Sequence, residues 1–216
     1  MAVNREYWLK RWIENRIGFH KTGVNPLLER FWPKVAAAPG RTLAPLCGKS
    51  ADLMWLASRG HDVVGVELSE SAARAFMSEQ GLAATIADDP PFTMMRAGRI
   101  TLLAGDFFDL TPNRIGRFDL IYDRAAIIAL PADLRPAYAR QLRSLLEPGG
   151  RMLLITLEYD QTQTDGPPFS VPESEVRALF VDLAIDRLHE HDCLDEEPRF
   201  KERGLKWMKE VVYHVH

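Results

Sequence analysis

Gly48 and Glu67, nineteen positions apart, have the residue types and the spacing of a nucleotide-binding βαβ unit. The stretch from Arg41 to Glu67 begins with a short apolar segment and turns at Gly48. It continues with a helical pattern and returns in a second apolar segment that ends on Glu67. In such a unit the glycine lets the backbone approach the ligand, and the acid accepts hydrogen bonds from ribose hydroxyls. The stretch therefore predicts a nucleoside site.

Two better-known phosphate-binding motifs do not fit this turn. Gly48-Lys49-Ser50 resembles the end of a Walker A loop, but Leu43 stands where that motif needs its first glycine. The dinucleotide fingerprint G-x-G-x-x-G is also absent, because Gly48 stands alone. A nucleoside without phosphate fits better, and S-adenosylmethionine is the common ligand of that kind. From these residues alone, one alternative stays open: a parallel α/β sheet whose loop glycine only turns the chain.

Polar or turn-forming residues follow each of four apolar segments that we interpret as strands. Strands that alternate with helical patterns indicate a doubly wound, mostly parallel α/β sheet. Ligands of such sheets bind beyond the carboxyl ends of the strands. The candidate site residues are therefore those that end strands: Leu46 with Gly48, Glu67 with Leu68, Asp106 with Phe107, and Asp123 with Arg124.

Residues 1–40 are expected to form a helical cover and residues 41–216 the α/β core of one domain. Pro33 is expected to end the second helix, and residues 88–98 to form a loop because they are rich in proline and polar residues. Ser170-Val-Pro-Glu173 has the pattern of a capping box. The expected helices span residues 4–16, 25–32, 69–80, 131–146 and 170–180, and the expected strands 43–46, 63–66, 100–104, 118–122, 152–157, 185–189 and 209–215.

Composition and charge exclude several classes of binding partner. A net charge of -3 and a pI near 6.1 argue against a nucleic-acid partner. The N-terminus has no apolar h-region and no run of 18 apolar residues occurs, so we expect a cytoplasmic protein without a membrane partner. We also expect a monomer. Cys47 and Cys193 form neither a disulfide framework nor a metal-ligand pattern. The His-x-His pairs at 189–191 and 214–216 have no further ligands at metal-site spacing, so no metal site is predicted.

Seven short segments carry a resemblance that spans nearly the whole chain: Trp8–Trp12, Gly18–His20, Pro45–Lys49, Gly65–Leu68, Tyr122–Arg124, Gly166–Phe169 and Pro198–Phe200. In this order they resemble the thiopurine S-methyltransferase family, especially its bacterial members. The resemblance implies a class I S-adenosylmethionine-dependent methyltransferase with a Rossmann-like fold and an N-terminal helical lid. The combination of PLCGK, GPPF and the paired tryptophans is specific to the family.

The resemblance also implies which residues surround the sulfonium and methionine parts of the cofactor. Trp8, Trp12 and Phe19 are expected to close over it, because a sulfonium cation gains cation–π attraction from aromatic faces. The backbone of Leu46 and Gly48 is expected to lie against the methionine part.

The nucleoside part is expected to contact the next three strand ends. Glu67, with Leu68 beside it, is expected to bind the ribose hydroxyls. Asp106 and Phe107 are expected to frame the adenine, with Asp106 accepting a hydrogen bond from the exocyclic amine. Arg124 is expected to lie against both the cofactor and the acceptor.

On the acceptor side, the resemblance implies Phe19, Arg124, Pro168, Phe169 and Arg199, with the two arginines in the catalytic role. Methyl transfer from a sulfonium needs the nucleophile as an anion about 3 Å from the methyl carbon. Nearby positive charge keeps a heterocyclic thiol ionised at pH 7. Arginine remains protonated itself, so it stabilises the thiolate without taking its proton.

Structural alternatives to these roles remain open. Arg124 is also placed to form an ion pair with Asp123 or Asp119, and Arg199 to be a solvated charge in an acidic run. His20 is expected to pack the turn at 18–20 or to line the acceptor pocket.

Three functions fit the sequence. The first is S-methylation of small heterocyclic or aromatic thiols, thiopurines among them. The second is methylation of inorganic selenium or tellurium species, and the third is a nucleoside-binding sensor that has lost transfer. Cys47 has no base beside it, so no covalent intermediate is expected.

Overall fold

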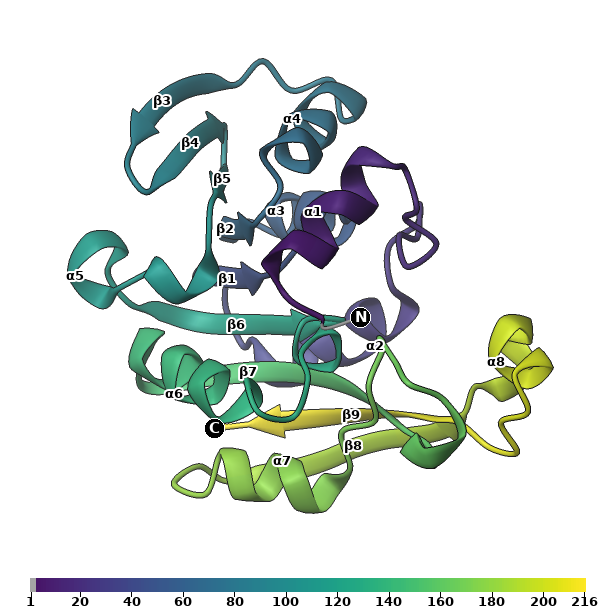
Figure 1. Ribbon diagram of the computed structural model, residues 1–216. Helices are drawn as coiled ribbons and strands as arrows, with labels where there is room; N and C mark the ends of the chain where they lie inside the picture. The colour runs from purple at the N-terminus through teal and green to yellow at the C-terminus, as the bar shows by residue number, and fades with distance from the viewer. Residues whose placement is uncertain (1–2) are drawn as a thin grey trace.

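One nine-stranded mixed sheet forms the centre of the computed structural model, which describes residues 3–216 (Figure 1). The strand order is β3-β4-β5-β2-β1-β6-β7-β9-β8. The five middle strands are parallel: β5 (Ile100–Ala104), β2 (Asp62–Glu67), β1 (Arg41–Pro45), β6 (Phe118–Arg124) and β7 (Leu146–Glu158). Antiparallel strands extend both sides: β3 (Thr85–Asp89) and β4 (Phe92–Ala97) on one, β9 (Lys209–Val215) and β8 (Ile185–Asp192) on the other.

Helices cover both faces of the sheet, which confirms the predicted doubly wound α/β class. Successive side chains of a strand point to opposite faces, so Leu43 packs with Tyr138 in one core cluster and Ala44 with Phe31 in the other. On the Ala44 face lie α2 (Pro26–Val35), α3 (Asp52–Ser58) and α4 (Glu70–Glu79); on the Leu43 face lie α6 (Arg135–Leu145) and α7 (Glu173–Leu179).

The chain order changes direction between β1 and β6. From β1 it proceeds through β2 to β5 on one side, and β6 then pairs with the opposite edge of β1. Ligands of doubly wound sheets bind at such a switch point. Leu46 after β1 and Ala125 after β6 both have positive φ, at 46° and 62°, although neither is glycine. Backbone strain of this kind clusters at functional sites, so the fold and the local conformation indicate the same place.

Three local predictions are wrong. Residues 88–98 form a hairpin, because β4 pairs with β5 and buries Phe92 and Met95. Pro33 lies inside α2, which continues to Val35 because that residue is fully buried. The capping box is absent: α7 begins at Glu173 behind Pro172, and the Ser170 hydroxyl accepts a hydrogen bond from the Tyr159 amide instead.

Two peripheral helices lie at the carboxyl ends of the parallel strands. Helix α1 (Arg5–Ile13) contains no fully buried residue and lies beside the arrowheads of β1 and β2 (Figure 1). Helix α8 (Pro198–Glu202) is held by Phe200, which belongs to a small satellite core with Tyr159 and Met208. The short α5 (Pro112–Ile115) precedes β6. Within residues 3–216, no helix has the length and apolar character to cross a bilayer.

Candidate active site

The Glu67 carboxylate joins the two loops that begin the candidate site. One oxygen accepts a hydrogen bond from the Gly48 amide at 2.9 Å, and the other accepts from the Ser69 amide at 2.8 Å. Ser69 in turn caps α4 by accepting from the Ala72 amide. Each carboxylate oxygen has a further lone pair. The group is therefore able to accept the ribose hydroxyls that the sequence predicts while it keeps both backbone donors.

Burial raises the pKa of Glu67 to about 7 from its ordinary value of 4.5. Hydrogen bonds from the backbone of Ser69, Gly48 and Leu68 oppose this rise but do not cancel it. A bound ligand that donates two hydroxyl hydrogen bonds favours the charged carboxylate. Ligand binding and the ionisation of Glu67 are therefore coupled near neutral pH.

The turn after β1 approaches α1 closely. Gly48 has φ +55°, and a Cβ at this position would lie 3.3 Å from the indole ring of Trp12. Both the backbone conformation and the space therefore favour glycine. Together with the positive φ of Leu46, this geometry brings the backbone of the turn close to α1. It fits the predicted contact with a methionine-like chain.

The three predicted aromatic residues meet at this point. The ring centroids of Trp8 and Phe19 are 5.5 Å apart, and those of Trp12 and Phe19 are also 5.5 Å apart, both in edge-to-face geometry. The Arg11 guanidinium lies 5.6 Å from the centroid of the Phe19 ring, which shows that this cluster accommodates a cation. Arg11 was not predicted from the sequence, although it lies between the paired tryptophans.

Asp106 and Phe107 follow β5 in different environments. One Asp106 oxygen accepts from the Phe108 amide at 3.0 Å, and the other lies 3.6 Å from the Arg5 guanidinium of α1. The Phe107 ring is buried in the core against Tyr138, with centroids 5.2 Å apart. The Phe107 backbone, rather than its ring, is thus the part that faces the strand ends. No motif in the sequence pointed to Arg5.

Arg124 ends β6 with a half-buried side chain. Within residues 3–216, its guanidinium forms no ion pair or hydrogen bond. The structural alternatives are absent: Asp123 accepts from the Tyr138 hydroxyl at 2.7 Å, and Asp119 accepts from the Arg41 amide at 2.8 Å. Burial raises the pKa of Asp123 to about 6 from 3.8, so this acid belongs to the core.

The charge of Arg124 acts on two neighbours that the sequence did not single out as a group. Burial, then the charge of Lys49, lowers the pKa of His20, and Arg124 adds to the lowering. Burial raises the pKa of Glu210 in β9, and Arg124 opposes that rise. His20 is therefore a neutral imidazole at pH 7 beside the candidate acceptor side. Glu210 was missed because its strand is distant in the sequence.

Arg199 connects α8 to the N-terminal turn. Its Nη1 donates to the Gly18 carbonyl at 2.9 Å, and its Nε lies 3.3 Å from a Glu197 oxygen. The guanidinium also lies 4.9 Å from the centroid of the Phe200 ring. The side chain is 42% exposed, so part of the guanidinium remains in contact with solvent. The turn at residues 18–20 thus contacts Arg199 directly and lies within the field of Arg124.

Pro168 and Phe169 are half-buried and fixed through their backbone. The Pro168 carbonyl accepts from the Tyr159 hydroxyl at 2.6 Å, and the Phe169 amide donates to the Ile128 carbonyl at 2.7 Å. The Arg135 guanidinium lies 5.7 Å from the centroid of the Phe169 ring. These contacts hold an apolar loop in place, as an acceptor wall requires.

Cys47 is unsuited to covalent catalysis. Burial, with the nearby Glu67 carboxylate, raises the pKa of the Cys47 thiol well above its ordinary value. A thiol that stays protonated is a poor nucleophile.

The fold defines a class of protein. The chain resembles the Burkholderia thailandensis 1,6-didemethyltoxoflavin-N1-methyltransferase with a TM-score of 0.65 at 19% identity, over 99% of this chain and 87% of that one. It resembles a TehB-like S-adenosylmethionine-dependent methyltransferase from Corynebacterium glutamicum with a TM-score of 0.55 at 16% identity, over 97% and 96% of the two chains. The architecture is therefore that of a class I methyltransferase.

Sequence comparison identifies the family. The profile described as Thiopurine S-methyltransferase (TPMT) matches residues 3–216. The chain is 46% identical to the thiopurine S-methyltransferase of Bordetella petrii, over 99% of this chain and 98% of that one. It is also 46% identical to that of Methylococcus capsulatus, over 98% and 96% of the two chains. The chain belongs to the thiopurine S-methyltransferase family and is an S-adenosylmethionine-dependent methyltransferase.

Cofactor affinity should depend on the ionisation of Glu67. Because burial raises the pKa of Glu67, its protonated form favours the folded state over the unfolded state. The contribution of this group to the free energy of unfolding is therefore largest below pH 4.5 and is lost as pH rises through about 7. Hydroxyl donors favour the charged form instead. Calorimetric titration with S-adenosylhomocysteine should therefore show affinity falling as pH falls below about 7, approaching tenfold per pH unit.

Glu67→Gln is the matched control, because it preserves the side-chain shape and removes the titration. The variant should bind S-adenosylhomocysteine more weakly than wild type. Its affinity should also lack the pH dependence that the titration of Glu67 causes in wild type. If the affinity changes with pH to the same extent in both proteins, Glu67 is not the ribose ligand.

Helix α1 should behave as a lid. It has no fully buried residue, and its tryptophans pack on Phe19 and the Gly48 turn. Amide hydrogen exchange in residues 4–20 should slow when S-adenosylmethionine is added, because the ligand supplies the surface that α1 lacks. Exchange in α6, which is packed in the core, should not change. Protection of α1 that is the same with and without ligand would make this helix a fixed part of the fold.

Proposed function

We propose that this chain transfers the methyl group of S-adenosylmethionine to the sulfur of small heterocyclic or aromatic thiols, thiopurines among them. The observation that carries the proposal is the guanidinium of Arg124. It stands at the carboxyl end of β6, half-buried, without an ion pair or hydrogen bond within residues 3–216. A partly desolvated charge interacts more strongly with a partner of opposite sign than a fully solvated charge does. A thiolate acceptor is such a partner.

The proposed role of Arg124 is to favour the ionised acceptor. S-adenosylmethionine, when bound, supplies an electrophilic methyl group, so the protein needs to hold an anionic nucleophile in line with it. Arginine keeps its proton at any physiological pH and acts as a fixed charge. His20, whose pKa is lowered, adds a neutral polar group beside this charge without competing for the proton of a thiol. No general base is required.

Arg199 has a second, mobile role in the proposal. Its bond to the Gly18 carbonyl links α8 to the turn that carries Phe19. The aromatic cluster closes over the cofactor, while Arg199 approaches the acceptor from the side of α8. Phe169 and Pro168 supply the apolar wall, which suits a flat heterocycle. Together these residues exclude water from the reacting sulfur and strengthen the charge effects there.

Membership in a methyltransferase family favours an enzyme over a nucleoside sensor. Thiols and inorganic chalcogen species share the chemistry of a compact, polarisable anion, so the acceptor class needs a direct test. A screen with labelled S-adenosylmethionine should include 6-mercaptopurine, thiophenol, selenite and tellurite. Turnover of the heterocyclic thiol well above that of the inorganic anions supports the proposal. Transfer only to selenite or tellurite would contradict it.

Replacing either arginine with methionine should reduce turnover most at low pH. The acceptor is then mainly protonated, and the fixed positive charge matters most for producing the thiolate. Loss of a charge-assisted contact of about 1.5–3 kcal/mol corresponds to a rate reduction of about ten- to a hundredfold. Raising the pH should recover part of the rate, while cofactor affinity should remain nearly constant.

Arg203→Met is the matched control. The Arg203 guanidinium also lies near Phe200, at 5.7 Å from the ring centroid, but it makes no contact with the N-terminal turn among those found in the structure. Its kinetics should stay close to wild type. A pH-independent loss in Arg124→Met, or an equal loss of cofactor affinity, would assign that arginine to the fold or to the donor site.

A further inference from the structure

Asp186, His214 and His216 bring three metal-binding side chains together at one end of β8 and β9. His214 and His216 are two residues apart, so both point to the same face of the strand. Asp186 lies directly opposite His214 in the antiparallel register. The His216 amide donates to the Ala184 carbonyl at 2.9 Å, and the Ala184 amide donates to the His216 carbonyl at 2.7 Å. Backbone hydrogen bonds therefore fix the positions from which all three side chains extend.

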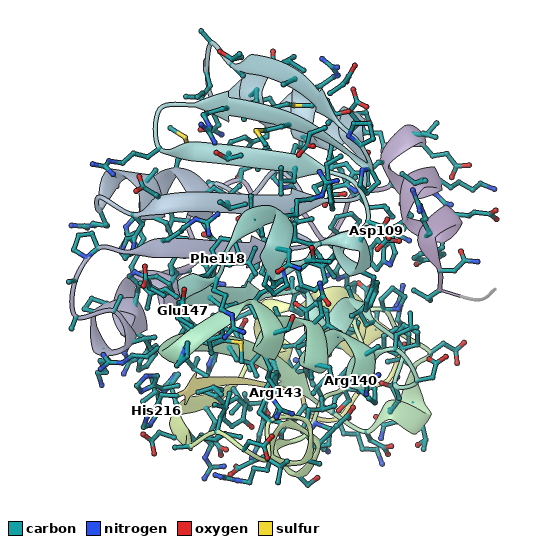
Figure 2. All side chains as sticks on the ribbon, turned by 90° about the vertical axis from the view of Figure 1, so that its left-hand side faces the viewer. Asp109, Phe118, Arg140, Arg143, Glu147 and His216 are labelled. Atoms are coloured by element: carbon teal, nitrogen blue, oxygen red, sulfur yellow. The ribbon has the colours of Figure 1, made fainter. Side chains whose placement is uncertain are left out.

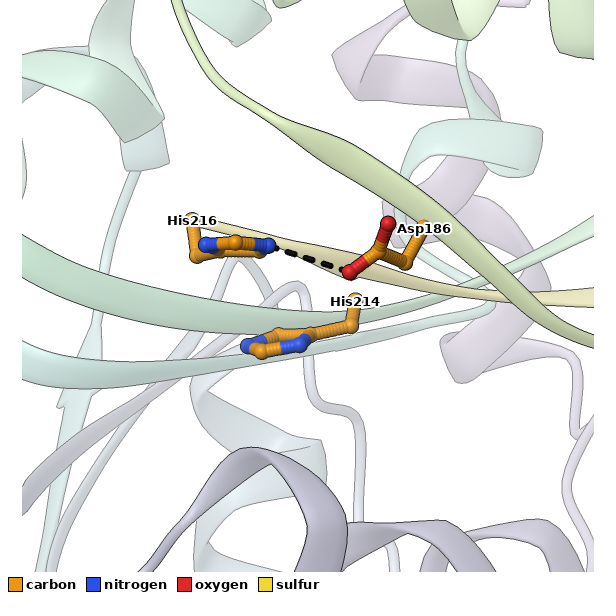
Figure 3. Close-up of side chains that lie close together, drawn as sticks. All are labelled: Asp186, His214 and His216. Atoms are coloured by element: carbon orange, nitrogen blue, oxygen red, sulfur yellow. Dashed lines mark hydrogen bonds and ion pairs between the residues drawn. The ribbon is translucent and has the colours of Figure 1, made fainter.

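The side chains converge (Figure 3). The two imidazole rings stack with centroids 4.4 Å apart and 23° between their planes. The Nε2 of His216 lies 3.1 Å from a carboxylate oxygen of Asp186. One ligand atom from each residue lies within 4.8 Å of the other two, and no other trio of this kind occurs within residues 3–216. Ligands of a tetrahedral zinc ion lie about 3.4 Å apart, so binding would require these atoms to move closer by at most about 1.4 Å.

The surroundings of His214 suit a ligand. Its Nε2 is shielded from solvent and has no hydrogen-bond partner within residues 3–216. A metal ion bound there would give this buried nitrogen the partner that buried polar atoms need. Arg151 opposes a cation, but its guanidinium is engaged by the Val35 carbonyl at 3.2 Å, and Asp186 supplies a compensating carboxylate.

We propose that Asp186, His214 and His216 bind one divalent transition-metal ion, of the zinc type, and that this ion fastens β8 to β9. Two imidazoles with one carboxylate favour zinc and similar ions over calcium or magnesium, which prefer oxygen ligands throughout. Three protein ligands leave coordination positions for water. Because β8 is the outermost strand and pairs only with β9, a link between the two would secure this edge of the sheet.

The location separates this site from the methyl-transfer site. Strand β9 runs opposite to β7, so Val215 pairs with Met152 in the middle of β7, while Glu210 pairs with Leu157 near its carboxyl end. Figure 2 shows His216 at the opposite end of the strands from α1. We therefore expect the ion to increase the stability of the fold and to have no direct part in methyl transfer, which takes place at the other end of the strands.

The test is calorimetric titration of the full chain, first treated with a chelator, with zinc chloride. We expect one saturable site and a rise in melting temperature on binding. His214→Ala and His216→Ala should each weaken binding by at least about tenfold, and Asp186→Asn should weaken it measurably. His189→Ala is the matched control: it belongs to the other stacked histidine pair and should leave zinc affinity unchanged.

Circular dichroism of each metal-free variant shows whether it is folded, and His216→Ala alters only an exposed side chain. Cobalt(II) provides a second readout, because its visible absorption reports nitrogen and oxygen coordination at the same site. Absence of saturable zinc binding to wild type would overturn the proposal. So would zinc affinity that survives His216→Ala or that is lost in His189→Ala.

Discussion

The two backbone hydrogen bonds accepted by Glu67 hold the candidate active site together. They join the turn after β1 to the start of α4 after β2, so one carboxylate fixes two loops that the sheet alone leaves independent. Charge-assisted bonds of this kind are strong, yet burial still raises the pKa of Glu67 to about 7. These donors alone therefore do not fully compensate the buried carboxylate. We expect a ligand that donates further hydrogen bonds to complete its environment, so that one group links the two loops and also binds the ligand.

Aromatic surface and positive charge occupy different parts of the candidate site, which matches the proposed division between cofactor and acceptor. The aromatic cluster lies over the turn at Gly48, whereas Arg124 is set by β6 on the neighbouring side of the switch point. Arg199 is fastened to the Gly18 carbonyl and therefore follows the N-terminal cover. If α1 acts as the proposed lid, its closure and the placement of Arg199 would be linked through this single turn. Arg124 is held by β6 and would not depend on that closure.

The sequence predicted the parallel core and the strand ends well, because buried strands and turn residues leave local patterns. The predictions were wrong or incomplete where contacts between segments distant in the sequence determine the structure. Residues 88–98 were predicted to form a loop because they are rich in proline and polar residues. In the structure β4 is stabilised by pairing with β5, which the local sequence does not indicate. Arg5 and Glu210 were not predicted as site neighbours, since only the fold brings them to Asp106 and Arg124. Asp186 was not predicted as a partner of His214 for the same reason. The pairing register between two strands cannot be deduced from the spacing of residues along one strand.

The β8–β9 ribbon places a histidine opposite an acid at each of its ends. His191 pairs with Glu210 at the carboxyl edge of the sheet, and His214 pairs with Asp186 at the amino edge. The surroundings give the two pairs different properties. Glu210 lies in the field of Arg124, which opposes the rise of its pKa. Asp186 instead accepts a contact of 3.1 Å from the Nε2 of His216 and forms a compact trio with the two histidines. Because antiparallel pairing sets both groups of side chains, one ribbon carries an acid in the field of Arg124 at one end and the proposed metal ligands at the other.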